Sequence, residues 1–331
     1  MTRVRWRVVI GLVISAACLV WVFHDVPVAS VRRDIHIKSW AWVGAAVCVQ
    51  AASYVCQGYR WRRLLRPLGE LSLVRATEAI YAGLFVNELM PAKPGELLRA
   101  YLVGRWLQLR LPAVLGSIVT ERIFDGLWLS IALTVTASLV PLPKPFVRIG
   151  VIFILVLATV AIVVSVLAIG RLQVPLLSAW RHALASRNGV IAFAGSGLLL
   201  FGQMLAFWCS LRGFGLPLSL LVAMATVVVI QLGTAIPNAP GNVGTYQLAC
   251  VAGLTLFGVD KTTATAFSIV VFVLLTVPVW CGGGIALAHM SVRQTVPGNV
   301  EWGNSSWLPT FRLTRWSALS APPRESPHRP H

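Results

Sequence analysis

Hydrophobic positions along this chain are gathered into long runs, and polar residues are largely confined to the short stretches between them. Six of the runs approach or exceed the roughly 18 residues that a helix needs to cross a bilayer. They lie at about 7–23, 40–58, 112–139, 149–169, 190–211 and 262–289. No segment shows the alternation of a barrel strand, and only helices or closed barrels satisfy their backbone groups in lipid. The pattern therefore predicts an all-α polytopic membrane protein with about six spanning helices.

Two further apolar regions are each interrupted by the motif P-x-x-P-G. The residues of the two motifs are Pro91, Pro94 and Gly95, and Pro237, Pro240 and Gly241. Proline stops a helix and glycine permits a turn, so we expect a helix break at each motif. The arm after each motif has about 14 residues, roughly 21 Å of helix, which is too short for a bilayer core of about 30 Å. The sequence predicts two re-entrant helical hairpins, with arms at about 73–90 and 95–108, and at about 218–236 and 245–258.

The order of these elements predicts an inverted repeat. A span, a hairpin and a span occupy about 40–139, and the same order recurs over about 190–289. Basic residues before the first run and after the second favour a cytoplasmic N-terminus. These residues are Arg3, Arg5, Arg7, Arg60, Arg62, Arg63 and Arg66. The first hairpin would then enter from the cytoplasm and the second from outside, as in transporters whose broken helices meet near the midplane.

Composition supports a membrane protein and gives its broad organisation. Hydrophobic residues make up 57% of the chain and charged residues 12%, about half the charge of a soluble domain. The net charge of +17 is interpreted as basic loops beside anionic lipid, and we expect no nucleic-acid partner. Residues 1–290 would form one transmembrane domain with an amphipathic cytoplasmic linker at 171–188, followed by a disordered basic cytoplasmic tail at 291–331. Both termini would be cytoplasmic, at the plasma membrane.

No pattern in the chain indicates a metal or a cofactor, and we expect neither. The histidines are scattered without the spacing of metal ligands, and no D-x-D pair occurs. All six cysteines lie in apolar runs, and none forms C-x-x-C. Buried free thiols are therefore the expected state of the cysteines.

Charged residues lie at the first break and in the span that follows it. Lys93, Glu96 and Arg99 stand at and beyond the break, with Glu88 just before it. Glu121, Arg122 and Asp125 lie about ten residues into the next span, close to the predicted midplane. Charges inside a membrane are costly and usually mark a pathway or a relay. The alternative is that Arg99 or Arg122 neutralises a nearby glutamate and the cluster only holds the helices together.

The two breaks also place helix N-termini inside the membrane. Such ends present free N–H groups and partial positive charge. Together with Lys93 and Arg99 they would suit an anionic head group that passes between leaflets. In this interpretation Glu121, Arg122 and Asp125 form a relay or gate with Glu96 and Arg99.

The residues of these motifs resemble the flippase-like transmembrane family, which includes the membrane half of the lysylphosphatidylglycerol synthases. The residues that carry the resemblance are Asn87, Pro91, Gly95, Glu96, Arg99, Glu121, Arg122, Asp125, Pro237, Pro240, Gly241 and Gly244. The resemblance covers about 1–290 and implies a flippase-like domain and lipid translocation. The chain has Gln247 where the family often has a glutamate, and we expect it to act without the soluble aminoacyl-transferase domain of the synthases.

We therefore expect a lipid translocase that moves an anionic phospholipid or a polyprenyl-phosphate-linked lipid. The candidate substrate-binding residues are Asn87, Lys93, Gly95, Glu96, Arg99, Glu121, Arg122, Asp125, Asn238, Gly241, Gly244 and Gln247. One alternative is a membrane-embedded transferase component that acts on a lipid-linked sugar or an aminoacyl group. The other is a membrane partner of a lipid-modifying enzyme that does not itself transport. The expected partners of the protein, in any of these roles, are membrane lipids, a partner enzyme or a second copy of the chain.

Overall fold

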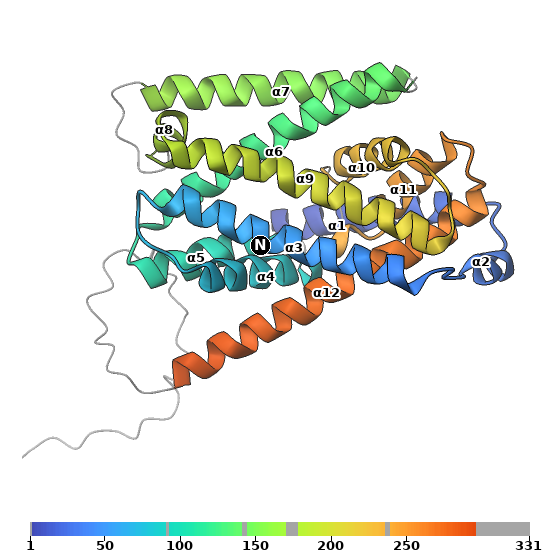
Figure 1. Ribbon diagram of the computed structural model, residues 1–331, viewed down its shortest axis with the longest axis horizontal. Helices are drawn as coiled ribbons and strands as arrows, with labels where there is room; N and C mark the ends of the chain where they lie inside the picture. The colour runs from blue at the N-terminus through green and yellow to red at the C-terminus, as the bar shows by residue number, and fades with distance from the viewer. Residues whose placement is uncertain (1, 91–92, 141–143, 170–177, 236–238, 296–331) are drawn as a thin grey trace, which may run out of the picture. The chain divides into compact units, whose positions relative to one another are not determined.

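Helices account for the regular structure in a computed structural model of the chain, which describes residues 2–90, 93–140, 144–169, 178–235 and 239–295 (Figure 1). The helices are α1 (Thr2–Phe23), α2 (Val28–Asp34), α3 (Trp40–Leu65), α4 (Leu73–Leu89), α5 (Gly95–Leu107), α6 (Leu111–Leu139), α7 (Lys144–Ile169), α8 (Ser178–Ala185), α9 (Arg187–Phe214), α10 (Leu220–Thr234), α11 (Thr245–Thr255) and α12 (Lys261–Thr295), with a 3-10 turn η2 (Pro240–Asn242) before α11. The prediction of an all-α protein is confirmed for these residues.

The chain divides into two units, residues 1–291 and residues 292–331. The first contains nearly all of the described structure. Of the second, only the end of α12 is described, and the predicted tail beyond residue 295 lies outside the described residues.

The two predicted helix pairs are present, each with a break at its motif. α4 ends at Leu89 and α5 begins at Gly95, and α10 ends at Thr234 before α11 begins at Thr245. Local sequence sets the starts as well, because the Ser72 and Ser219 hydroxyls accept backbone N–H groups in the first turns of α4 and α10. The two arms of each pair pack against each other.

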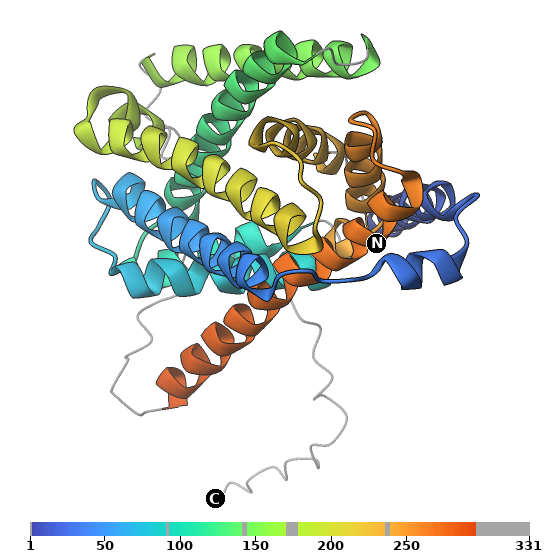
Figure 2. The same ribbon diagram turned by 45° about the vertical axis from the view of Figure 1, so that its right-hand side comes forward.

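α3 and α9, which would open the two predicted repeat units, lie side by side and antiparallel (Figures 1 and 2). Gly213 near the end of α9 accepts backbone hydrogen bonds from Lys38 and Ser39, just before α3. At the other end of the pair, the Arg60 side chain passes over Gly195. Small residues along α9 let the two backbones approach closely, as is common between membrane helices.

Each helix pair is embedded in its own hydrophobic cluster. α4 and α5 pack with Trp61 and Leu65 of α3 and with the first turns of α6. α10 and α11 pack with α9 and α12 in a larger cluster that includes Phe207 and Phe267. The two helix pairs therefore belong to different hydrophobic clusters.

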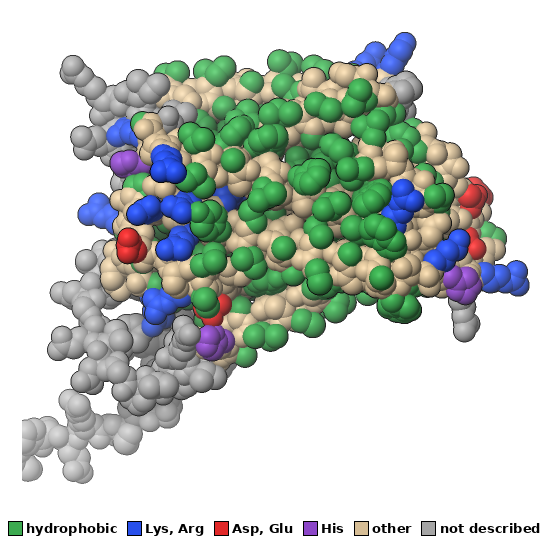
Figure 3. All heavy atoms as spheres, viewed as in Figure 1, with side chains coloured by type: hydrophobic (Ala, Val, Ile, Leu, Met, Phe, Trp, Pro, Cys, Tyr) green, Lys and Arg blue, Asp and Glu red, His purple; other side chains and the backbone are tan. Residues whose placement is uncertain are grey.

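The described helices of residues 1–291 have the surface of a membrane protein. Among the described residues, three helices contain segments long and apolar enough to cross a membrane, namely Val147–Leu167, Arg187–Phe214 and Lys261–Ser291. In the segment Val147–Leu167 only 6% of the apolar window is buried inside the protein, and hydrophobic side chains are exposed along α7. On the face in Figure 3, charged side chains gather toward the two ends and hydrophobic ones cover the area between them. Exposed apolar surface on this scale is not tolerated in water.

Several details differ from the sequence predictions. The loop after the first run contains a short helix, α2, and the predicted linker at 171–188 is described only from Ser178 onward, where α8 packs on α6 and α9. All six cysteines are free thiols, as expected. Burial holds only for some of them, because Cys48 and Cys281 lie on outward faces of their helices and are exposed.

Candidate functional site

The two broken helix pairs meet at their breaks. The Lys93 ammonium of the first break donates to the backbone carbonyl of Thr234, the last residue of α10, at 3.4 Å. A Cβ atom on Gly241 of the second break would lie 2.8 Å from a carboxylate oxygen of Glu88. The expected approach of the two breaks is confirmed for these residues. Pro91, Pro237 and Asn238 lie outside the described residues, so their predicted roles stay predictions.

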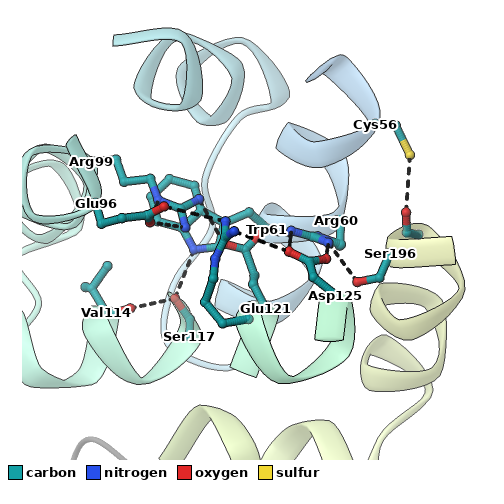
Figure 4. A network of polar contacts seen from close by, with 12 residues as sticks. Cys56, Arg60, Trp61, Glu96, Arg99, Val114, Ser117, Glu121, Asp125 and Ser196 are labelled. Carbon is teal, nitrogen blue, oxygen red and sulfur yellow. Dashed lines mark hydrogen bonds and ion pairs between the residues drawn. The ribbon is translucent and has the colours of Figure 1, made fainter. Parts of the chain in front are cut away.

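Arg60 lies at the centre of a buried ionic cluster (Figure 4). Its guanidinium donates to Glu121 Oε1 from Nε at 3.2 Å and from Nη2 at 2.8 Å, and it also pairs with Asp125. Nη1 donates to the Ser196 hydroxyl of α9 at 2.7 Å. The side chains of Arg60 and Glu121 have no exposed surface. Arg60 thus joins α3 to α6 and α9.

Arg99 extends the cluster to α5. Its Nε donates to Glu96 Oε2 at 2.7 Å, and its Nη1 lies 2.8 Å from Glu121 Oε2. The guanidinium also stacks over the ring of Trp61, 4.8 Å from its centroid. The Arg99 side chain is only 3% exposed. Glu121 is therefore held between two guanidinium groups, and each of these has further partners.

Arg122 is the loosely held member of the cluster. Its two terminal nitrogens lie 3.5 Å from Glu96 and 3.7 Å from Asp125, beyond ordinary hydrogen-bond length. Its side chain is 52% exposed, against 0% for Arg60 and 3% for Arg99. The cluster contains three guanidinium groups and three carboxylates, so its formal charge is balanced, as buried charges require.

The exposed part of the cluster faces a cavity of about 520 Å³. Its charged lining residues are Glu88, Lys93, Glu96, Arg122 and Asp125. Neither Arg60 nor Arg99 is among the lining residues. The volume lies in the range of about 300–1,000 Å³ that is typical of ligand sites. The candidate residues therefore divide into a buried group that joins helices and an exposed group that lines the cavity.

Asn87 and Gly95 shape the first break. The Asn87 side-chain oxygen accepts the Gly95 backbone N–H at 2.7 Å and so caps α5. A Cβ atom on Gly95 would lie 1.8 Å from the Gly83 carbonyl oxygen of α4, so the close approach of the two arms requires glycine. We had expected Gly95 to permit a turn, but the residue in the left-handed region is Lys93, with a φ of 51°. The cap also takes up an N–H group that was predicted to face the head group.

Gly241, Gly244 and Gln247 shape the second break in a related way. Gly241 has a φ of 67°, which favours glycine. The Gln247 side chain accepts the Gly244 backbone N–H at 2.7 Å. A glutamate at this position could accept the same bond. The difference from the family pattern therefore leaves the cap intact, and a contact of Gln247 with substrate stays a prediction.

Arg60 is the central residue that the sequence interpretation missed. It was assigned to a cytoplasmic flank after a span ending near residue 58, but α3 continues to Leu65 and buries it. A signal for this was present, since Trp61, Leu64 and Leu65 continue the apolar helical spacing and are all buried. Ser196 carried no comparable signal, because a lone serine in an apolar run is common.

A smaller chamber of about 210 Å³ adjoins the charged cavity. The two share the lining residues Tyr54, Glu88, Gln203, Gln231, Thr234 and Asn242. Within the described residues, no group of three or more histidine, cysteine, aspartate or glutamate side chains is placed to hold a metal ion.

Comparisons with known proteins indicate a membrane protein. A family model described as "Lysylphosphatidylglycerol synthase TM region" matches residues 8–283. The chain is also similar to the glycosyltransferase AglD of Haloferax volcanii, with 29% identity over 122 residues. That similarity covers 37% of this chain and only 20% of the glycosyltransferase. No solved structure matches the chain significantly.

Proposed function

The chain belongs to the lysylphosphatidylglycerol synthase TM region family, and from this premise we propose that it translocates an anionic lipid between the leaflets of the plasma membrane. Family membership supports a membrane protein related to lipid metabolism. The cavity at the meeting point of the two helix breaks is compatible with translocation. Broken backbone deep in a membrane protein is tolerated where it is buried in protein or lines a wet cavity.

The proposed membrane arrangement has six spans, α1, α3, α6, α7, α9 and α12, with α4–α5 and α10–α11 as re-entrant hairpins. Both termini would be cytoplasmic, and the hairpins would enter from opposite sides. The antiparallel contact of α3 and α9 supports this arrangement, because it is what inverted repeat units require.

The single observation that carries the proposal is the unequal state of the three arginines. Arg60 and Arg99 are buried and each form an ion pair of 2.8 Å with Glu121, whereas Arg122 is half-exposed in the cavity with ion pairs of 3.5 and 3.7 Å. Lys93 is also exposed and lines the same cavity. A lipid phosphate between these two groups would accept charge-assisted hydrogen bonds from both of them. For Arg122, these bonds would be stronger than the long ion pairs with Glu96 and Asp125.

A leaflet-resolved assay tests this function. The full chain is reconstituted into vesicles with labelled anionic lipids, and the label on the outer leaflet is quenched over time. Arg122→Gln should lower the apparent lipid affinity by about 10- to 100-fold, the effect of losing a charge-assisted hydrogen bond of about 1.5–3 kcal/mol. Arg62→Gln, at an exposed arginine in the last turn of α3, is the matched control and should behave as wild type.

The same assay separates translocation from chemical modification. The similarity to a glycosyltransferase raises a membrane-embedded transferase as the second candidate. Mass spectrometry of the recovered lipid distinguishes the two, because a translocase returns the lipid unchanged. Unaltered lipid that never changes leaflet, in the presence of folded protein, would refute translocation.

A further inference from the structure

The chamber beside the charged cavity has a different chemistry from the cavity itself. Its polar lining consists of amides and hydroxyls from several helices, and Glu88 is the only charged residue among the described residues that line it. These groups are Gln50, Gln203, Gln231, Asn242, Tyr54, Tyr246, Thr234 and Thr276. Tyr246 and Phe272, whose rings are 5.4 Å apart, form part of an apolar wall. An apolar pocket with a few convergent polar groups is the usual form of a small-molecule site.

Three residues that line this chamber each carry a hydrogen-bond acceptor that lacks a donor among the described residues. The acceptors are Gln50 Oε1, Glu88 Oε2 and Asn242 Oδ1, and all three atoms are buried. Gln50 is only 6% exposed, and its amide nitrogen is already used in a hydrogen bond of 2.8 Å to Tyr54. Buried polar groups are nearly always paired, so the chamber is suited to a ligand that brings donors.

The donors that fit best are hydroxyl groups. A cation would be expected to meet several carboxylates, whereas here Glu88 stands alone among uncharged groups and also interacts with the Lys93 ammonium. Gln231 and Gln203, linked at 2.9 Å, add an amide pair at the entrance shared with the charged cavity. Amides can both donate to and accept from hydroxyls, which makes them suitable partners for a sugar.

We propose that this chamber binds the uncharged, hydroxyl-bearing part of the lipid head group, a sugar attached to the phosphate that Arg122 and Lys93 hold. This inference rests on the proposed function, because it assumes that the phosphate occupies the charged cavity. The shared lining places the two parts next to each other, as a phosphate-linked sugar requires. The substrate class is therefore a glycosylated polyprenyl phosphate or a glycosylated phospholipid.

The proposal is tested by measuring how tightly lipids bind to the purified full-length chain in detergent. Binding is detected as an increase in the melting temperature of the protein. The probes are a polyprenyl phosphate, the same lipid carrying a hexose on its phosphate, and lysylphosphatidylglycerol. Wild type should bind the hexose-bearing lipid about tenfold more tightly than the bare phosphate. Gln50→Leu and, separately, Tyr246→Phe should each reduce that preference by about 3- to 10-fold, as expected for one hydrogen bond, while leaving affinity for the bare phosphate unchanged.

Gln57→Leu is the matched comparison, because Gln57 lines the charged cavity but not the chamber. It should leave the preference for the hexose intact. Equal affinity of wild type for the two polyprenyl lipids would overturn the chamber's role and leave the proposed function standing. Tighter binding of the lysyl lipid would show that the chamber takes an ammonium group, which also overturns the proposal. Failure to bind any of the three lipids would overturn the proposed function itself.

Discussion

Replacement of Glu121 by glutamine tests which part of the ionic cluster holds the helices together. Glu121 is fully buried and lies 2.8 Å from nitrogens of both Arg60 and Arg99. Glutamine keeps the shape of the side chain but removes its charge, so two buried guanidinium groups lose their shared carboxylate. Removal of one partner from a buried ion pair costs about 3–5 kcal/mol.

We therefore expect Glu121→Gln to be strongly destabilising while the folded fraction still transports. At about 2 °C per kcal/mol, the apparent melting temperature in detergent should fall by about 6–10 °C. Glu70→Gln, at an exposed glutamate in the loop after α3, is the matched control and should not shift it. The double variant Glu121→Leu with Arg99→Met should recover part of the loss, because an apolar pair can replace a buried ion pair at little cost.

The measurement is tryptophan fluorescence during heating, with leaflet-resolved transport normalised to folded protein. A melting temperature within about 2 °C of wild type would contradict the structural role of Glu121, given the cost expected for a broken buried pair. Normal stability together with lost transport would instead support the relay or gate in which Glu121 acts with Glu96 and Arg99.

Two further predictions concern the hairpins and their orientation. Gly95→Ala should destabilise the protein, because the added Cβ atom would lie 1.8 Å from the Gly83 carbonyl oxygen. Gly44→Ala is the control and should be neutral or slightly stabilising, because nothing lies within 4 Å of the added atom. Equal melting temperatures of the two variants would contradict the close approach of α4 and α5. In a cysteine-free background, a cysteine at Glu70, before α4, should react with a membrane-impermeant reagent from the cytoplasmic side, and one at Pro217, before α10, from the outside. Reaction of both positions from one side would exclude the inverted arrangement.

Much of the helix pattern could be predicted because it depends on local rules. Proline and glycine end helices whatever surrounds them, so Pro91 and Gly95 placed the end of α4 and the start of α5 within one residue of the structure. The same reasoning gave the start of α11 at Thr245. The short α2 was not predicted, since a seven-residue helix leaves little periodic signal.

The sequence could not predict which charged residues of the cluster are buried and which face the cavity, because burial depends on tertiary contacts. Arg99 and Arg122 looked equivalent in sequence, yet packing against Trp61 buries the first while the cavity exposes the second. Arg60 was hidden for the same reason, since its partners Glu121 and Ser196 are more than 60 residues away in the chain. The packing of α3 against both α6 and α9 brings these three side chains together.

The charge balance of the cluster bears on how a lipid could leave the site. A site with a net positive charge deep in the membrane would bind phosphate strongly and release it slowly, whereas passage requires binding that is favourable but weak enough to reverse. Here the carboxylates of Glu96 and Asp125 both lie within 4 Å of the Arg122 guanidinium. A departing head group would therefore be replaced by carboxylates that are already in place, and the guanidinium would never be left unpaired. The long ion pairs of Arg122 are thus what the proposed exchange of partners needs, whereas the short pairs of Arg60 and Arg99 suit residues that do not move.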